Sequence, residues 1–255
     1  MTDATLISLV RRHDPDRFFT ALFAPPERRG ALLALYAFNH ELARAREAAS
    51  EPTLALIRLQ WWREGVEGAR RHHEVATPLG AALDAGALHA PDLLSLMAAR
   101  EAETEPSVPS RAAWQAYVRG TAGGLAVAAG RALGAEAPAL LARLSDLGTA
   151  YGVAGQLRNV RALASQGRCL LPEDMLAAQG LSVHDVIARP DAPVLTELVA
   201  WGRQLLSQAR GRIPRPVLAA ALPAVLARRD LRRQTTVRGF GDKLAVLMAA
   251  AQSRI

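Results

Sequence analysis

Residues 31–64 constrain the fold more than any other part of the sequence, because they hold two helical patterns separated by a very short break. Apolar side chains recur every three or four positions up to Glu47, which is the spacing of one α-helical face. The corner Ser50-Glu51-Pro52 follows, and proline in the first turn of a helix loses no hydrogen bond that the helix needs. A second apolar pattern with Trp61 and Trp62 then begins. Two long helices joined by so short a connection must pack antiparallel.

The first of these two helices has polar side chains on the face that should point inward. Tyr36, His40 and Glu47 fall within roughly 60° of one another, and Asn39 lies on the same apolar stripe. An aromatic ring, an imidazole and a carboxylate on one inward face indicate the wall of a binding site. We therefore take Tyr36, Asn39, His40, Arg44 and Glu47 as candidate ligand-binding residues. The alternatives are a hydrogen-bonded structural role for His40, and solvent exposure or pairing with nearby glutamates for Arg44.

A second wall is predicted over residues 136–165, where glycines at helical spacing clear one face of the helix. Gln156 and Asn159 present amide groups on that face. The helical pattern breaks at Gln166-Gly167 and restarts at Pro172. We add Gln156 and Asn159 to the candidate ligand-binding residues.

The rest of the sequence is also helical in pattern. We predict further helices over residues 5–23 (broken at Asp14-Pro15), 77–89, 91–103, 182–188, 190–210, 214–229 and 242–253, with an acidic connector over 101–110. Gly120, Gly123 and Gly124 should let a neighbouring backbone approach closely. A chain of 255 residues, half of them apolar, can bury one full core. We therefore expect an all-α fold, with a single domain over residues 1–255.

Several segments resemble the squalene/phytoene synthase family of head-to-head prenyl synthases. They read DPDRFFTALFAP, YAFNHELARAREAASEP, RLQWWRE, YVRGTAGGL, GTAYGVAGQLRN, GRCLLPEDML and LPAVLARRDL, in the family's order from about residue 14 to 232. The likeness is closest to a side branch whose mitochondrial members are assembly factors for the respiratory NADH dehydrogenase. The resemblance implies the isoprenoid synthase fold, with antiparallel helices around a central apolar cavity, and a helical tail over 233–255. It also implies that Tyr117, in the YVRGTAGGL segment, lines that cavity and binds ligand.

The same resemblance implies where a metal site should be. Active members of the family carry two pairs of aspartates, each pair four residues apart on a helix, that hold Mg²⁺ against a prenyl diphosphate. Here the first pair would fall at about Ala43 or Arg44 and Glu47, and Leu163 stands where an aspartate of the second pair is expected. No carboxylate occurs from Leu147 to Pro172. We therefore predict no catalytic residue, no metal ligand and no cofactor, with Mg²⁺ expected only if the protein is an active transferase.

Three functions remain open. The first is a non-catalytic or divergent family member that assists the assembly of a membrane protein complex or binds an isoprenoid or lipid phosphate. For such a ligand, Arg44, Arg158, Arg161 and Arg168 would meet the anion directly, because guanidinium groups bind phosphate bidentately; surface solvation is the alternative for each. The second is an active prenyltransferase that condenses prenyl diphosphates. The third is a basic peripheral protein that binds anionic lipid or nucleic acid without a pocket.

Composition bears on partners and location. The net charge is +7, but 30 of the 31 basic residues are arginine and they are scattered in twos and threes, without an RNA-binding or helix-turn-helix motif. This argues against nucleic acid and leaves weak contact with an anionic membrane surface. The single Cys169 fits a reducing compartment. The sequence shows neither a secretory signal nor an apolar run long enough to span a bilayer. We expect a cytoplasmic protein that acts at the inner face of a membrane.

Overall fold

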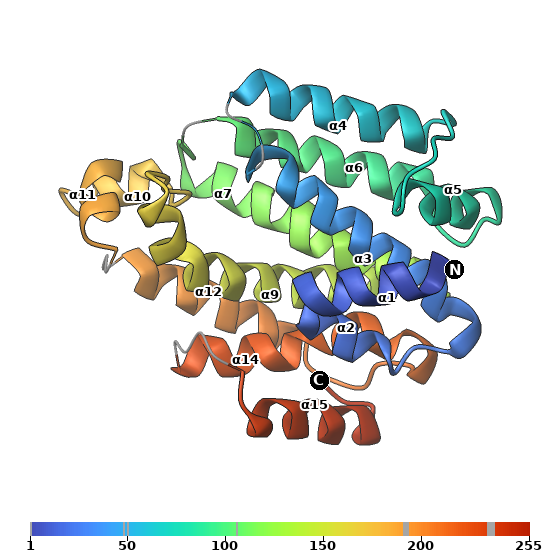
Figure 1. The fold of residues 1–255 in the computed structure, drawn as a ribbon. Helices are drawn as coiled ribbons and strands as arrows, with labels where there is room; N and C mark the ends of the chain where they lie inside the picture. The colour runs from blue at the N-terminus through green and yellow to red at the C-terminus, as the bar shows by residue number, and fades with distance from the viewer. Residues whose placement is uncertain (1, 48, 50, 106, 191–193, 234–237) are drawn as a thin grey trace.

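The first antiparallel pair forms as the sequence pattern predicts. In the computed structural model, which describes residues 2–47, 49, 51–105, 107–190, 194–233 and 238–255, α3 (Pro26–Glu47) and α4 (Pro52–Val66) run in opposite directions (Figure 1). Before them come α1 (Thr2–His13) and α2 (Pro15–Ala21). Asp14 separates α1 from α2, and its side chain accepts the backbone N–H of Arg17 at 3.0 Å, which caps α2. Ser50 of the predicted corner lies outside the described residues.

The long helix α9 (Pro138–Ser165) runs through the centre of the molecule (Figure 1). It packs against α8 (Gly124–Ala132), α12 (Val194–Gln208) and α14 (Pro223–Arg233). Its glycines make the close approach possible: a Cβ atom on Gly148 would lie 2.5 Å from the carbonyl oxygen of Ala122, and one on Gly152 would lie 2.5 Å from Ala122 Cβ. Gly123 meets α9 from the other side, since a Cβ there would lie 2.5 Å from Thr149 Oγ1. The predicted close approach of a neighbouring backbone at Gly123 is confirmed, and Gly148 and Gly152 have the same role from the side of α9.

The helix that carries the YVRGTAGGL segment contains a wide turn. It begins as α7 (Arg111–Val118), continues as one π-helical turn, η2 (Arg119–Gly123), and returns to α-helical geometry in α8. Single π-helical turns within α-helices are frequently found at functional sites. Here the turn faces α9 across the glycines described above.

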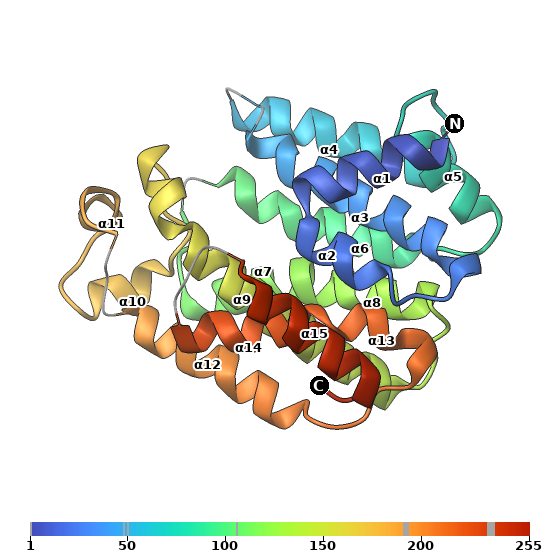
Figure 2. The ribbon, with the colours of Figure 1, turned by 60° about the horizontal axis from the view of Figure 1, so that its bottom comes forward.

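The other elements surround this centre. They are α5 (Ala76–Asp84), α6 (Ala90–Arg100), the 3₁₀ turn η1 (Glu101–Thr104), α10 (Glu173–Ala177), α11 (Val183–Ala188), the 3₁₀ turn η3 (Arg215–Val217), α13 (Leu218–Ala221) and α15 (Phe240–Gln252). One continuous hydrophobic cluster extends from Leu6 to Ile255, so the described residues share a single core. Figure 2 shows α15 lying across α14 on the outside of the molecule.

Three predicted boundaries are wrong, each for a local reason. The predicted helix 77–89 ends at Asp84, because Gly86 has a left-handed backbone with φ of 67°. The predicted helix 214–229 is divided before Pro223, which has no N–H to bond to the preceding turn, and its last part continues to Arg233. The connector 101–110 starts with the helical turn η1, whose Glu103 is buried.

Two predicted segments are described only in part. Residues 191–193 of the predicted helix 190–210 and residues 234–237 of the C-terminal tail lie outside the described residues. Within the part of the chain that the structure describes, no residue belongs to a β-strand, and no helix combines the length and hydropathy needed to cross a bilayer.

Candidate functional site

A cavity of about 320 Å³ lies where the α1–α2 junction, α3, η1, η2 and α9 meet. Its walls come from segments that are far apart in the sequence. The lining residues are His13, Asp14, Arg17, Asn39, Ala43, Glu47, Arg100, Glu103, Tyr117, Val118, Thr121, Ala122, Tyr151, Gly152, Gly155, Gln156, Arg158, Asn159, Leu163, Arg168 and Leu170. Seven of these side chains are Asp, Glu or Arg, so the expectation of an apolar cavity is wrong. The predicted central position of the cavity is confirmed.

The buried carboxylate of Glu103 organises one side of the cavity. Its Oε1 atom accepts hydrogen bonds from the Tyr117 hydroxyl at 2.6 Å and from Arg100. Arg100 also donates to Asn39 Oδ1 at 3.1 Å, and Gln156 Nε2 donates to the Tyr117 hydroxyl at 3.1 Å. Burial, and then the charge of Glu103, raise the pKa of Tyr117, so this phenol stays protonated and donates to the carboxylate.

Arg17 occupies the opposite side, between two tyrosines. Its guanidinium carbon lies 4.8 Å from the ring centre of Tyr151 and 5.8 Å from that of Tyr36. Burial alone would lower the pKa of Arg17, but the Asp14 carboxylate at 2.7 Å, together with Tyr151 and Tyr36, raises it and the net shift is upward. The pKa of Tyr36 is raised, mainly by burial. Arg17 is therefore a permanent cation held in place by a carboxylate and two rings.

A chain of ion pairs connects the cavity wall to the C-terminal helices. Arg158 of α9 pairs with Asp230 of α14, and Asp230 also pairs with Arg238. Arg238 reaches Asp16 of α2 at 2.7 Å, and Asp16 accepts the Tyr151 hydroxyl at 3.0 Å. These contacts join α2, α9 and α14 through two carboxylates and two guanidinium groups.

The structure brings seven of the eleven predicted ligand-binding residues together in the cavity wall. They are Asn39, Glu47, Tyr117, Gln156, Arg158, Asn159 and Arg168. Tyr36 is buried behind the wall, beneath Arg17. Arg44 lies outside the cavity, where it pairs with Glu41 at 3.3 Å beside the groove that contains Trp61.

His40 lies next to the cavity and stacks on His13, with 4.2 Å between the ring centres. Its Nε2 atom is buried and has no hydrogen-bond partner among the described residues. Burial, followed by the nearby His13, lowers the pKa of His40. The His40 ring is therefore protonated only at a lower pH than a free histidine.

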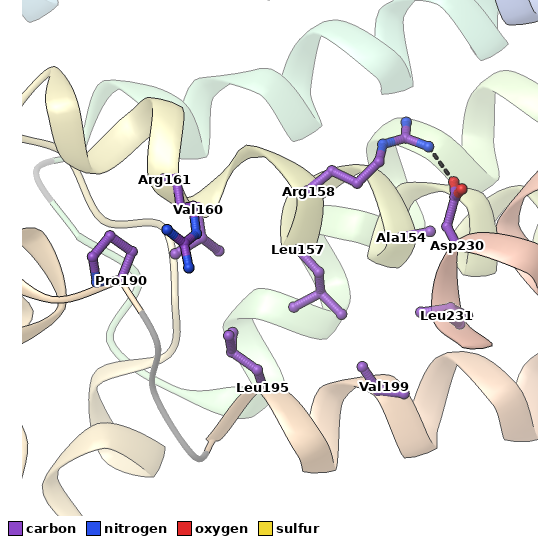
Figure 3. A pocket seen from close by; sticks show the side chains of 10 residues that line it. All are labelled: Ala154, Leu157, Arg158, Val160, Arg161, Pro190, Leu195, Val199, Asp230 and Leu231. Atoms are coloured by element: carbon purple, nitrogen blue, oxygen red, sulfur yellow. Dashed lines mark hydrogen bonds and ion pairs between the residues drawn. The ribbon is translucent and has the colours of Figure 1, made fainter. Parts of the chain in front are cut away.

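Arg161 lines a second, smaller pocket of about 160 Å³ between α9, α12 and α14 (Figure 3). Leu157, Leu195 and Val199 form its apolar sides, while Arg158 extends away from them towards Asp230 (Figure 3). The two arginines predicted to act together, one helical turn apart, thus lie at different ends of this pocket.

Sequence reasoning missed several charged residues of the site. Asp14 and Arg17 belong to the DPDR segment, whose spacing of three is a helix-capping signal, and this signal could have drawn attention to them. Arg100 and Glu103 stood at the end of a predicted helix and in a predicted connector, and no local pattern marks them as buried. Arg100 and Glu103 pair locally, three residues apart, but the contact of Arg100 with Asn39 forms only once α6 and α3 pack together.

The cavity does not offer the donor set that Mg²⁺ requires. Ala43 and Leu163, at the positions where the family resemblance expects aspartates, both face the cavity and carry no oxygen. Of the three lining carboxylates, Asp14 is paired with Arg17 and Glu103 with Arg100, and Glu47 is the only carboxylate of the first expected pair in the cavity wall. Across the described residues, no group of three or more His, Cys, Asp or Glu side chains could hold a metal ion. The residues present therefore do not fit the magnesium cluster of an active prenyl synthase.

Known proteins resemble this chain in both sequence and fold. A family model described as squalene/phytoene synthase matches residues 10–238. The mouse protein named NADH dehydrogenase (ubiquinone) complex I, assembly factor 6 is 28% identical over 229 residues, which cover 86% of this chain and 68% of the mouse protein. The human protein of the same name is 28% identical over 193 residues, covering 74% of this chain and 58% of the human protein.

Two solved structures are similar over nearly the whole chain. A crystal structure of a dehydrosqualene synthase in complex with ligand superposes with a TM-score of 0.80 at 16% identity, covering 98% of this chain and 95% of that one. The squalene synthase HpnC from Alicyclobacillus acidocaldarius superposes with a TM-score of 0.69 at 17% identity, covering 99% and 94%. At these identities the likeness establishes the fold.

Proposed function

Because this chain belongs to the squalene/phytoene synthase family, we propose that it keeps the family's cavity without its metal-dependent chemistry and acts as an assembly factor for a respiratory NADH dehydrogenase. The proposal includes action at the inner face of the membrane that carries the complex. It is supported by the names of the mouse and human relatives and by the composition of the cavity wall.

The observation that carries the non-catalytic part is that Ala43 and Leu163 stand where metal-binding aspartates are expected, while the cavity carboxylates Asp14 and Glu103 are paired with arginines. Ionising an allylic diphosphate requires metal ions that absorb the charge of the leaving group. Asp14 and Glu103 could bind such an ion only after releasing Arg17 and Arg100, which are themselves buried cations. An unpaired buried cation is strongly destabilising, so this exchange is unfavourable.

The first test measures the chemistry. The purified protein would be incubated with farnesyl diphosphate and Mg²⁺, with a dehydrosqualene synthase as the positive control, and pyrophosphate release would be followed. We expect release from the control only. Magnesium-dependent pyrophosphate release by this protein, above that of a heat-inactivated sample, would contradict the non-catalytic proposal.

The second test measures assembly. Deleting the gene in its source organism should reduce the fully assembled NADH dehydrogenase on native gels, while succinate dehydrogenase activity stays unchanged. The wild-type gene should restore the complex. Normal amounts of assembled complex in the deletion strain would contradict the assembly role without bearing on the first test.

One observation favours a second candidate, metal-independent binding of an isoprenoid or lipid phosphate. Arg168 lies at the cavity, and its guanidinium donates to the backbone carbonyl of Glu103 at 3.4 Å, whereas Arg158 is committed to Asp230. Calorimetry with farnesyl diphosphate in the presence of EDTA should detect binding that Arg168→Gln removes. The surface variant Arg119→Gln is the matched control, because Arg119 pairs with Asp146 away from the cavity. Equal binding by both variants would exclude Arg168 as the anion ligand.

A further inference from the structure

The C-terminal helix α15 presents a stripe of exposed apolar side chains. Phe240, Leu244, Leu247 and Met248 are 82%, 44%, 47% and 55% exposed, and their spacing places them on one helical face. Val246, on the opposite face, is fully buried against the core. A contiguous exposed apolar stripe on an otherwise well-packed domain marks an interaction site.

The helix is held firmly with this stripe pointing outwards. Asp242 of α15 pairs with Arg229 of α14 from the packed face of the helix. Beyond the end of α15, the Ile255 N–H donates to the Gly211 carbonyl at 3.2 Å, and the Gly211 N–H donates to the Ile255 carbonyl at 3.3 Å. Contacts at both ends thus keep α15 on α14, as Figure 2 shows, with the stripe exposed.

The net positive charge of the chain is concentrated in the C-terminal segment that ends in this helix. Residues 198–255 contain eleven arginine and lysine residues and two aspartates, a net charge of +9, whereas residues 1–197 contain twenty basic and twenty-two acidic residues, a net charge of −2. Both aspartates, Asp230 and Asp242, are already paired with arginines. The basic side chains of this region therefore outnumber the acids that could neutralise them.

Three of these arginines, Arg210, Arg228 and Arg232, are close enough for the charges of the first and last to act on the second. Arg228 has an Nη2 atom that is buried and has no hydrogen-bond partner in the described part of the chain. Burial, and then the charges of Arg210 and Arg232, lower its pKa. Arg210 directly precedes Gly211, which pairs with Ile255 at the end of α15. The arginine cluster therefore borders the helix that carries the apolar stripe.

Another exposed apolar face differs in its charge surroundings. Leu54 and Ile57 of α4 are 44% and 59% exposed, on the opposite side of the molecule (Figure 1). Near them, Arg63 pairs with Glu101 at 2.8 Å, and residues 51–67 contain two arginines and three glutamates, so this segment has no excess of positive charge. This face lacks the unmatched positive charge of the α15 region and provides a control surface.

We propose that α15 and the arginine cluster Arg210, Arg228 and Arg232 form a docking surface for an anionic lipid bilayer. The apolar stripe enters the boundary between headgroups and acyl chains, while the exposed guanidinium groups of Arg210 and Arg232 contact lipid phosphates. A bilayer covers both features at once, whereas a nucleic acid would match the charge and leave the apolar stripe in water. The inference goes beyond the assembly role and can fail by itself, because vesicle binding is measured without any partner protein.

Flotation with vesicles tests this surface. The full-length protein should bind vesicles of phosphatidylcholine mixed with phosphatidylglycerol, bind pure phosphatidylcholine much more weakly, and lose binding as salt rises. Phe240→Ser with Leu247→Gln, and separately Arg210→Gln with Arg232→Gln, should each reduce binding about tenfold or more. Leu54→Gln with Ile57→Gln on α4 should bind like the wild type. Thermal unfolding would show that every variant is folded.

Several results would overturn the proposal. One is undiminished vesicle binding by the Phe240→Ser, Leu247→Gln variant, and another is an equal loss in the α4 variant. Equal binding to neutral and anionic vesicles would remove the role of the arginine cluster. Self-association in sedimentation, abolished by the stripe variant, with no vesicle binding by the wild type, would assign the surface to a second copy of the chain. RNA binding that is as tight as vesicle binding and insensitive to the stripe variant would assign it to a polyanion.

Discussion

The cavity and the C-terminal surface both use arginine, but in opposite electrostatic settings. Inside, Arg17, Arg100 and Arg158 each face a carboxylate, as in the Arg17–Asp14 pair at 2.7 Å. Around α15, Arg228 and Arg232 lie close to each other, and burial adds to the cost of the charge on Arg228. The same residue type therefore serves two purposes. The cavity arginines form ion pairs within the chain, whereas the surface arginines leave positive charge available to an external partner.

This difference also explains how the cavity can persist without metal ions. In an active relative, Mg²⁺ would neutralise carboxylates that face each other across the helices. In this chain the cavity carboxylates Asp14 and Glu103 are neutralised by Arg17 and Arg100, cations that belong to the protein, so these pairs hold the wall together without a ligand. The arrangement keeps a cavity shape while removing the group that would carry out the reaction.

The largest expected effect comes from breaking an internal pair. Asp230→Asn keeps the side-chain volume but leaves Arg158 and Arg238 without the carboxylate that both contact. Two partly buried cations would then lack a common partner, which should lower the free energy of unfolding by about 3–5 kcal/mol. Urea denaturation followed by circular dichroism measures this change.

The matched control for that variant is a surface pair. Asp146→Asn removes the partner of Arg119, whose side chain is 46% exposed, and should cost less than about 1 kcal/mol. Equal losses in the two variants would mean that pairing at the cavity contributes no more than pairing at the surface. The distinction drawn between the two regions would then be lost.

A smaller effect on stability is expected from replacing two glycines of α9, which tests how closely the interior is packed. Gly148→Ala places a Cβ atom 2.5 Å from the Ala122 carbonyl oxygen, and backbone cannot move aside easily, so we expect a loss of about 1–3 kcal/mol. Gly155→Ala meets only Arg158 Nη2, at 3.9 Å, and alanine is the better helix former. That variant should gain up to about 1 kcal/mol. Losses of equal size would show that close packing is not what selects glycine at Gly148.

The sequence was sufficient for the features that depend on local periodicity. The α3–α4 corner, the break after α9 at Gly167 (φ of 69°) and the placing of Asn39 and Gln156 at the cavity follow from helical spacing and turn residues. The family resemblance predicted over residues 14–232 is confirmed by the match over 10–238, and the isoprenoid synthase fold is confirmed by the solved structures.

What could not be predicted depends on contacts between distant parts of the chain. Asp16 and Arg238 are separated by 222 positions, and Asn39 and Arg100 by 61, so no local pattern relates them. The angle at which helices cross decides whether these long side chains meet. The expected apolar cavity was wrong partly for this reason, since four of its seven charged lining residues come from the α1–α2 junction, the end of α6 and η1, which periodicity did not assign to a wall.

The next prediction concerns pH and His40, whose buried Nε2 atom has no hydrogen-bond partner in the part of the chain that the structure describes. Burial and His13 lower the pKa of His40 below its ordinary value of 6.5. The unfolded chain therefore binds a proton at a higher pH than the folded chain, and stability falls as pH drops below about 6.5. Unfolding measured across this range should show a shallower decline in His40→Gln than in the wild type. An identical decline in both would show that protonation of His40, at the contact between α1 and α3, does not cause the loss of stability.

The smallest expected effect has the opposite sign to the first. Arg228 and Arg232 are four residues apart on α14, a spacing at which like charges destabilise a helix by about 0.2–0.5 kcal/mol. Arg232→Gln should therefore raise the free energy of unfolding by about that amount, more at low salt than at high salt. Arg119→Gln, which removes a cation from a matched pair, should instead lower it slightly. A loss of stability in Arg232→Gln would mean that the surface arginines hold the fold together as the cavity arginines do, and would leave no unmatched charge there for a membrane to attract.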